Sequence, residues 1–274
     1  MKKSSMGLAL IAAAVLSGCM NPPRGDDVIF SSMKQKDVVL LGEVHDNAEG
    51  HRQRAALIQR AVELDQRRPA IAMEQFDRER QGDLDRALKS CNDADCVILA
   101  AGGAKASWNW AFYKPVIDLA LKYQLPLIAA NVSRADGAKI SKEGFAAAFD
   151  PATLASLGLD KPVPADIQSA QEKEIAAGHC GKLPATALPG MARAQVARDA
   201  YMAKVLRDHR QPHGVILLAG NGHVRRDLGA PRWLGTDVQA LSVAFVEATP
   251  DAAAYDLFAV VPAATRPDPC AAFG

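Results

Sequence analysis

Residues 37–43 have the sequence Asp-Val-Val-Leu-Leu-Gly-Glu, and this stretch decides the fold class. A short apolar run that starts with β-branched residues and ends at a glycine predicts a buried strand. A helix is expected over residues 50–64, because Ala55, Ile58 and Val62 recur on one helical face. A strand followed by a helix is the repeating unit of a parallel sheet.

The same alternation of strands and helices continues along the chain. Short apolar runs predict three more core strands, over residues 69–76, 126–132 and 214–219. The spacing of apolar residues predicts long helices over 115–123 and 190–209. The expected fold class is therefore α/β, with a mostly parallel central sheet flanked by helices.

Three segments are expected to depart from this alternation. Residues 91–107 are rich in glycine and alanine and are expected to form a loop. Residues 137–190 contain scattered proline and glycine, which predicts a cap-like insertion of loop and short helix. Two further strands, over 238–248 and 255–261, are expected to form a C-terminal antiparallel pair. Residues 37–274 are expected to form a single domain.

The N-terminus has the pattern of a bacterial export signal. Two lysines precede a short apolar stretch that ends in Leu16-Ser-Gly-Cys19, which resembles a lipobox. We expect a lipoprotein signal peptide over residues 1–18, acylation of Cys19 with palmitate among its lipids, and a lipidated tether over 19–36. An ordinary secretory signal is the alternative. Met20 follows the cysteine, and by resemblance to Gram-negative lipoprotein sorting this predicts anchoring in the outer membrane.

Charge and cysteine content restrict the partners and the compartment. The formal net charge is +1, so no basic surface for nucleic acid is expected. Besides Cys19, four cysteines remain, which suggests two disulfides in an exported protein. Their spacing favours Cys91–Cys96 and therefore Cys180–Cys270. A metal pair formed by the first two cysteines is the alternative, although no histidine lies near them in the sequence.

Charged and imidazole side chains follow three of the expected core strands. Glu43 and His45 follow the first strand, Glu74 ends the second, and His223 follows the fourth. Because ligands bind at the carboxyl ends of parallel strands, we expect these groups to converge on one edge of the sheet. A purely structural hydrogen-bond network around the two glutamates is the alternative. His51, on the polar side of a helix, is expected to be solvated.

Five short motifs follow one another along the chain. They are Val38-Val-Leu-Leu-Gly-Glu-Val-His-Asp-Asn47, Ala72-Met-Glu-Gln-Phe76, Trp108-Asn-Trp-Ala-Phe-Tyr-Lys-Pro115, Arg198-Asp-Ala-Tyr-Met-Ala203 and Ala219-Gly-Asn-Gly-His-Val224. Together they resemble the ChaN family of haem-binding lipoproteins. The resemblance implies haem or iron uptake, a homodimer with haem at its interface, and an outer-membrane haem or iron receptor as a further partner. The wider group includes Tiki metalloproteases and erythromycin esterase-like hydrolases, which use glutamate and histidine at the same strand ends.

Haem binding is the favoured hypothesis, and it needs an axial ligand for iron and cations for the propionates. Tyr113 is the first candidate for the ligand, because it lies between two tryptophans and a helix start, and Tyr201 is its rival. His45 or His223 could ligate the iron directly or support a phenolate by a hydrogen bond. No Cys-x-x-Cys-His motif occurs, so the haem is expected to be non-covalent. The candidate cations are arginines near the site in sequence: Arg52, Arg225, Arg54 and Arg226.

The alternative hypothesis is a metal-dependent hydrolase. Glu43, His45, Glu74 and His223 would be its catalytic residues, with His45, Glu74 and His223 as metal ligands. Neither a His-Glu-x-x-His helix nor a Gly-x-Ser-x-Gly elbow is present in the sequence. A non-enzymatic haem-binding protein is therefore preferred, and a pure interaction lipoprotein is a third possibility.

Overall fold

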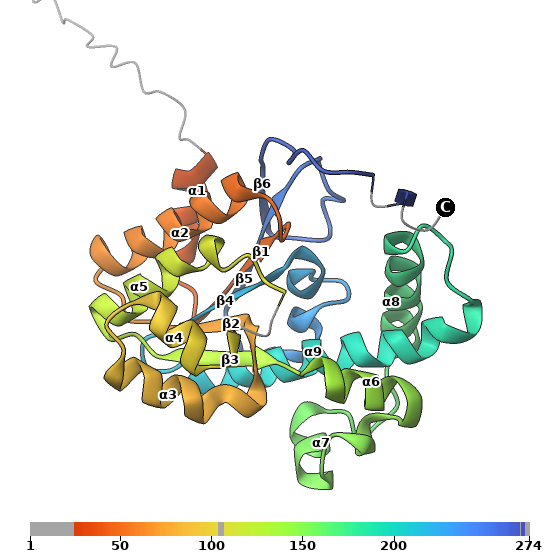
Figure 1. Cartoon of the computed structure of the whole chain (residues 1–274). Coiled ribbons are helices and arrows are strands. Elements are labelled where there is room, and N and C mark those ends of the chain that lie inside the picture. Colours follow the sequence, from red (N-terminus) through yellow and green to blue (C-terminus); the bar gives the residue numbers. More distant parts are fainter. Residues whose placement is uncertain (1–24, 104–106, 269, 272–274) are drawn as a thin grey trace, which may run out of the picture.

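The computed structural model describes residues 25–103, 107–268 and 270–271. The expected signal peptide and the lipid site Cys19 lie outside these residues. In the described part of the chain, six strands form one sheet in the order β3-β2-β4-β1-β5-β6 (Figure 1). The strands are β1 Val38–Glu43, β2 Ala70–Asp77, β3 Leu127–Asn131, β4 Val215–Gly220, β5 Ala240–Val246 and β6 Leu257–Val260. Neighbouring strands are parallel throughout, so their carboxyl ends share one edge.

The central strand β1 is buried on both faces of the sheet. Val39 and Leu41 belong to one apolar core, while Val38 and Leu40 belong to the core on the opposite face. Successive side chains of a strand point to opposite faces, so a strand covered on both sides must be apolar at every position. This requirement explains the continuous apolar run in the sequence, and the expected α/β fold with helices on both faces is confirmed.

Helices cover the two faces unequally (Figure 1). Five helices pack on the first face: α1 Gly25–Met33, α2 Ala48–Glu63, α3 Gln81–Ser90, α4 Ala94–Ala100 and α5 Lys114–Tyr123. The long helix α9, Leu188–His209, packs on the second face. Three helices of the expected cap region, α6 Arg134–Glu143, α7 Pro151–Leu157 and α8 Ala165–Gly178, pack in turn against α9. Short 3-10 helices connect these elements: η1 Arg78–Arg80, η3 Trp110–Phe112, η4 Phe145–Ala147, η5 Ala185–Ala187, η6 Asn221–Val224 and η7 Ala230–Trp233.

The expected antiparallel pair at the C-terminus is wrong, because β5 and β6 are parallel, with Val243 opposite Leu257. After β5, the loop over 247–256 returns along the sheet. The backbone N–H of Asp256 donates to the carbonyl of Ser242 at 3.0 Å, and the Asp256 carboxylate accepts from the backbone N–H of Ser242 at 2.8 Å. These two bonds hold the loop beside the first half of β5, so β6 starts in the same direction without an intervening helix.

Part of the expected tether is also helical. Residues 25–33 form α1, in which Ile29, Phe30 and Met33 are buried in the core of the first face. The three apolar side chains fall on one helical face, and this spacing is hidden by the polar residues around them. The folded domain therefore begins at residue 25 at the latest.

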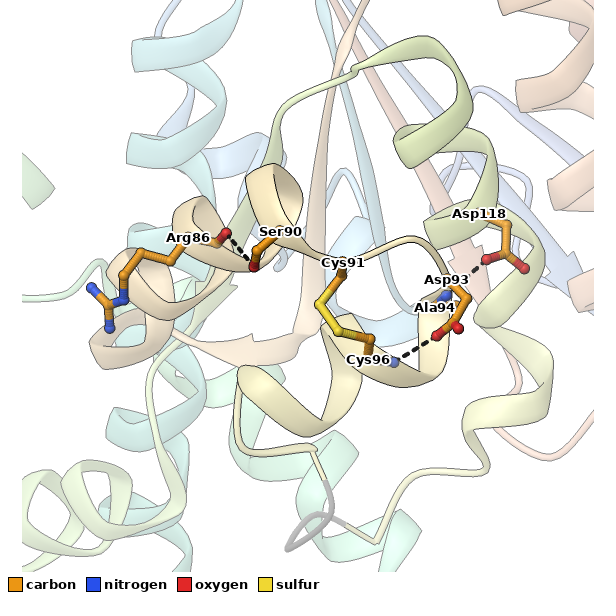
Figure 2. Close-up of a disulfide and its surroundings, with 7 residues drawn as sticks. All are labelled: Arg86, Ser90, Cys91, Asp93, Ala94, Cys96 and Asp118. Atoms are coloured by element: carbon orange, nitrogen blue, oxygen red, sulfur yellow. Dashed lines mark hydrogen bonds between the residues drawn. A yellow bond between two sulfur atoms is a disulfide. The ribbon is translucent and has the colours of Figure 1, made fainter.

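A disulfide between Cys91 and Cys96 confirms the first expected pair and joins the end of α3 to the first turn of α4 (Figure 2). Asp93 caps α4, since its carboxylate accepts from the backbone N–H of Cys96 at 2.8 Å. The Asp118 carboxylate, from α5, accepts from the backbone N–H of Ala94 at 2.8 Å (Figure 2). Two carboxylates thus satisfy free N–H groups at the helix start. The glycine- and alanine-rich loop expected here is therefore partly a helix.

The second expected disulfide, Cys180–Cys270, is also confirmed and joins the C-terminal tail to the segment after α8. Before this disulfide, the Arg266 guanidinium binds the carboxylates of Asp46 and Glu247. The tail is thus attached both to the loop that follows β1 and to the cap region. Among the described residues, no helix is both long and apolar enough to cross a membrane.

Candidate functional site

A cavity of about 730 Å³ lies at the carboxyl edge of the sheet. Its walls come from the ends of β1, β2 and β3, from η6 after β4, and from α9, because parallel strands deliver their following residues to the same edge. His45, Glu74 and His223, expected to converge from the sequence, all line it. The other lining residues used below are Gln75, Asp77, Arg80, Trp108, Arg134, Gln195 and Arg198.

A larger cavity, of about 850 Å³, lies between α3 and α5. It has no histidine, tyrosine or tryptophan among its lining residues. The cavity at the sheet edge is therefore the better candidate for a functional site, since it combines titratable groups with aromatic walls.

His45 presents its imidazole to this cavity. Its side chain is 50 % exposed, and its Nδ1 lies 2.7 Å from Oε1 of Glu43, whose side chain is fully buried. The ring packs edge-to-face on Trp108, with 5.0 Å between the ring centroids. Because the carboxylate accepts from Nδ1–H, the Nε2 atom is left as the free nitrogen of the neutral ring.

Gly220 gives the His45 ring its space. A Cβ atom at residue 220 would lie 3.0 Å from both Cε1 and Nε2 of His45, closer than ordinary van der Waals contact. An alanine at the end of β4 would therefore shift the ring by a few tenths of an ångström. The Nε2 atom of His45 consequently lies against the carboxyl end of the neighbouring strand.

Glu43 is the centre of a buried charge network behind His45. The Arg54 guanidinium forms an ion pair with Oε2 of Glu43, and both side chains are almost fully buried. Burial alone would raise the pKa of Glu43, but Arg54 and the hydrogen bond from His45 lower it to about 2. Burial disfavours protonation of His45, yet the hydrogen bond to Glu43 and the charge of Glu74 raise the pKa of its imidazole.

His51 belongs to the same network, and the expectation that it is solvated is wrong. It is only 3 % exposed, because α2 turns this residue toward the core. Its Nδ1 accepts from Arg54 at 2.8 Å, so its Nε2–H donates to the backbone carbonyl of His45 at 3.0 Å. Burial and the Arg54 charge lower the pKa of His51 to about 4, so this ring is neutral and holds the loop that carries His45.

Tyr113, the first candidate for the iron ligand, lies behind His45 and does not line the cavity. Its side chain is 1 % exposed, and its hydroxyl donates to Oε1 of Glu43 at 2.5 Å. Burial and the Glu43 charge raise the pKa of the phenol well above its ordinary value. Tyr201, the rival ligand, is partly buried among apolar side chains of α9 and the cap, and it does not line the cavity either.

His223 forms the second histidine–carboxylate pair of the cavity. Its Nδ1 lies 2.6 Å from Oδ1 of Asp199, and its Nε2 lies 3.6 Å from Oε1 of Glu74. Burial raises the pKa of Asp199 to about 6, although the nearby His223 opposes this rise. Burial disfavours the charged form of His223 too, but Asp199 and Glu74 raise its pKa. Both carboxylates are further fixed, since Glu74 accepts from the backbone N–H of Gly220 at 2.7 Å and Asp199 accepts from Gln171 at 2.9 Å.

Asp199 is a site residue that the sequence reasoning missed, although a signal for it exists. On α9 the neighbouring positions Val196, Ala200 and Ala203 are buried in apolar contacts, and Asp199 lies on the same buried side. A charged residue within an apolar helical stripe is rarely tolerated without a partner. The partner, His223, is distant in the sequence and could not be named without the fold.

The arginines expected to serve the site lie elsewhere. Arg52 is exposed and bonds Glu49, whereas Arg225 is paired with Asp227 and Glu174. Arg54 is used by Glu43 inside the network, and Arg226 is paired with Asp256. None of the four lines the cavity, because sequence proximity to a strand end does not fix the direction of a long side chain. Three other arginines line it instead: Arg80, Arg134 and Arg198.

The alternative metal set of His45, Glu74 and His223 lines this one cavity. Within residues 25–103, 107–268 and 270–271, no three His, Cys, Asp or Glu side chains are arranged to hold a metal ion. Nε2 of His223 lies 3.6 Å from Oε1 of Glu74, while Nδ1 of His45 is held by Glu43. The same lining residues can nevertheless contact a larger ligand that fills the cavity.

Comparison with known proteins shows which family this chain resembles. A family model described as haem-binding uptake, Tiki superfamily, ChaN, matches residues 29–234. The structure is similar to that of ChaN of Campylobacter jejuni, described for cofacial heme binding, with a TM-score of 0.67 and 19 % identity over 84 % of this chain and 89 % of that chain. A mutant of the erythromycin esterase EreC in its open conformation gives a TM-score of 0.47 and 16 % identity over 80 % and 72 % of the two chains. The type III effector HopBA1 gives 0.47 and 13 % over 89 % and 97 %. No curated protein sequence matches the chain.

Proposed function

Because the chain belongs to the ChaN family of haem-binding uptake proteins, we propose that it holds haem non-covalently in the cavity at the carboxyl edge of its sheet. The observation that carries the proposal is the placement of His45. Its imidazole is half exposed in the cavity, while the buried Glu43 carboxylate takes its Nδ1–H. Histidines that bind metals in proteins are held by a carboxylate in this way.

The residues around the cavity fit a haem. Haem supplies an iron that accepts an axial ligand, an apolar macrocycle and two propionate carboxylates. Nε2 of His45 is the free nitrogen donor, and Trp108 provides apolar aromatic surface. A volume of about 730 Å³ lies within the range of about 300–1,000 Å³ that is usual for ligand sites. His45 would thus hold the iron, and Trp108 would contact the macrocycle.

His45 is a better ligand than Tyr113 on physical grounds. The Tyr113 hydroxyl would have to leave Glu43 and lose a proton that burial and the Glu43 charge retain. We therefore assign Tyr113 to positioning: its O–H donates to the same carboxylate oxygen that orients His45. Arg54 keeps that carboxylate ionised, and neutral His51 fixes the backbone carbonyl of His45.

The remaining parts of the proposal concern the cellular setting. We propose a lipid anchor on Cys19, residence in the outer membrane, a homodimer with haem at its interface, and delivery to or from a haem or iron receptor. The lipobox sequence and the family membership support these parts. The two disulfides are consistent with export to an oxidising compartment.

A titration tests haem binding. Hemin is added to the full chain in detergent micelles, with empty micelles as the blank, and the Soret band and the molecular mass are recorded. We expect saturable binding with dimer formation, and at least a tenfold loss of affinity in His45→Ala. Tyr113→Phe should weaken binding less than His45→Ala does. Featureless, non-saturating absorption by the wild type would remove the haem proposal, and the reverse order of the two variants would make Tyr113 the ligand.

A hydrolytic function is the second candidate, and one observation favours it. The pair of His223 and buried Asp199 has the arrangement of a general base that is oriented by a carboxylate, with Glu74 nearby. The test is turnover of ester and amide libraries, with and without added zinc or manganese. Loss of turnover in both Asp199→Asn and His223→Ala would support a hydrolase, whereas inert wild-type protein under all conditions would leave it without support.

A further inference from the structure

Two of the arginines in the cavity wall have no anionic partner in the part of the chain that the structure describes. Arg134 begins α6, and Arg198 lies in the middle of α9. Neither forms an ion pair with any residue that the structure describes. With the residues described, the Arg198 guanidinium has a single hydrogen bond, from Nη1 to Oε1 of Gln195 at 3.2 Å, and the Arg134 guanidinium has none. In contrast, the third arginine of the wall, Arg80, is paired with Asp83.

The guanidinium of Arg198 is also partly removed from water. Burial lowers its pKa, although the carboxylates of Glu74, Asp199 and Asp77 oppose this effect at a distance. A desolvated cation without a close anion is costly, so such a group usually serves a ligand or a partner. The planar guanidinium presents two parallel N–H donors, which match the two oxygens of a carboxylate.

A second, independent observation also indicates a polar ligand in this cavity. Gln75, from β2, lines the cavity and is only 4 % exposed. Neither its Nε2 nor its Oε1 has a hydrogen-bond partner among the described residues. Buried amides are almost always satisfied, so an unsatisfied one at a cavity is expected to bond a bound molecule. Its Nε2 is a donor, as the arginines are, and the three groups together favour an acceptor such as a carboxylate.

We propose that Arg134 and Arg198 form a carboxylate-binding subsite for the two propionates of haem, with the Gln75 amide as a further donor. The inference rests on the proposed haem function. It replaces the arginines expected from the sequence with two that the fold brings together from α6 and α9. The subsite selects haem by its acidic groups, whereas His45 and Trp108 serve the iron and the macrocycle.

The experiment compares hemin with hemin dimethyl ester, in which both propionates are uncharged. Each is titrated into the full chain in micelles, and affinities are taken from the Soret change. We expect the wild type to prefer hemin by about tenfold or more. Arg198→Gln should lower the affinity for hemin by about tenfold. Because Arg134 is exposed, Arg134→Gln should lower it by only about threefold. The affinity for the ester should change by less than about twofold in both variants. Arg198→Lys should recover part of the hemin affinity, because it restores the charge but not the planar fork.

Arg52→Gln is the matched control, because this arginine is outside the cavity and paired with Glu49, and it should change neither affinity. Circular-dichroism melting of each apo variant separates loss of folding from loss of binding. Equal affinity of the wild type for hemin and its ester would overturn the subsite even if Arg198→Gln does not fold. Equal weakening of both ligands in the arginine variants would also overturn it. No saturable change with either ligand would instead overturn the haem function itself, and the subsite with it.

Discussion

Replacing Glu43 by glutamine should destabilise the protein strongly, because it leaves the buried Arg54 guanidinium without its anion. The pKa of Glu43 falls from an ordinary 4.5 to about 2, despite burial, through Arg54 and His45. At about 1.4 kcal/mol per unit of pKa, this lowering of the pKa corresponds to about 3 kcal/mol of stability. Breaking a buried ion pair from one side costs about 3–5 kcal/mol, so both routes give the same magnitude.

The unfolding free energy should depend on pH, because folding lowers the pKa of Glu43. A carboxyl group whose pKa is lowered on folding stabilises the protein above its unfolded pKa of 4.5, and the contribution is lost as the pH falls toward 2. About 2 kcal/mol of it should be gone at pH 3. The difference in unfolding free energy between the wild type and Glu43→Gln should therefore narrow by about that amount between pH 7 and pH 3.

The assay is urea unfolding followed by tryptophan fluorescence at both pH values. Glu49→Gln is the control, because Glu49 also has a pKa lowered to about 2, by hydrogen bonds from Arg52 and Gln53, but at the surface. An exposed pair of this kind contributes less than about 1 kcal/mol. Equal losses of stability in the two variants at pH 7, or a Glu43→Gln deficit that is the same at both pH values, would contradict a stabilising role of the buried ion pair.

Three further predictions follow from other contacts. Gly220→Ala should shift the His45 ring by a few tenths of an ångström and lower hemin affinity less than His45→Ala does, while Gly222→Ala, whose Cβ meets nothing within 4 Å, should leave the affinity unchanged; the Soret titration decides. Asp199→Asn should lower the pKa of His223, measured by NMR titration of its ring, and an unchanged pKa would show that Asp199 does not hold the proton there. Replacing both cysteines of the disulfide after α8 should cost up to about 4–5 kcal/mol in urea unfolding, against about 2 kcal/mol for the disulfide between α3 and α4; the opposite order would contradict the loop-length argument.

The core of the fold could be predicted because the evidence for it is local. An uninterrupted apolar strand such as Val38–Leu41 needs cover on both faces, which indicates a parallel sheet between helices. The direction of β6 could not be predicted in the same way. It depends on the bonds between Asp256 and Ser242, which only the folded loop brings together.

For the site, too, some features could be predicted from the local sequence and others depend on the folded structure. The sequence shows that four polar side chains lie at or just after the ends of core strands: Glu43, His45, Glu74 and His223. The parallel topology brings them to one edge of the sheet. How deeply a side chain is buried is not visible in the sequence. Tyr113 lies behind the cavity because the start of α5 packs on α2, and its hydroxyl donates a hydrogen bond to Glu43. Arg134 and Arg198 could not be predicted either, since they come from α6 and α9, whose positions depend on long-range packing.

The place of β1 in the middle of the sheet has a consequence for how the chain acquires its structure. Val38 is paired with Val215 on one side and with Ala240 on the other, so both neighbours of this early strand are synthesised near the end. Such distant pairings make folding slow and leave two unpaired strand edges until the last part of the chain arrives. β2 and β3, which are close in sequence, can associate first. The His45 ring lies against Gly220 at the end of β4, and His223 follows that strand, so an incomplete chain that lacks β4 cannot form the whole cavity.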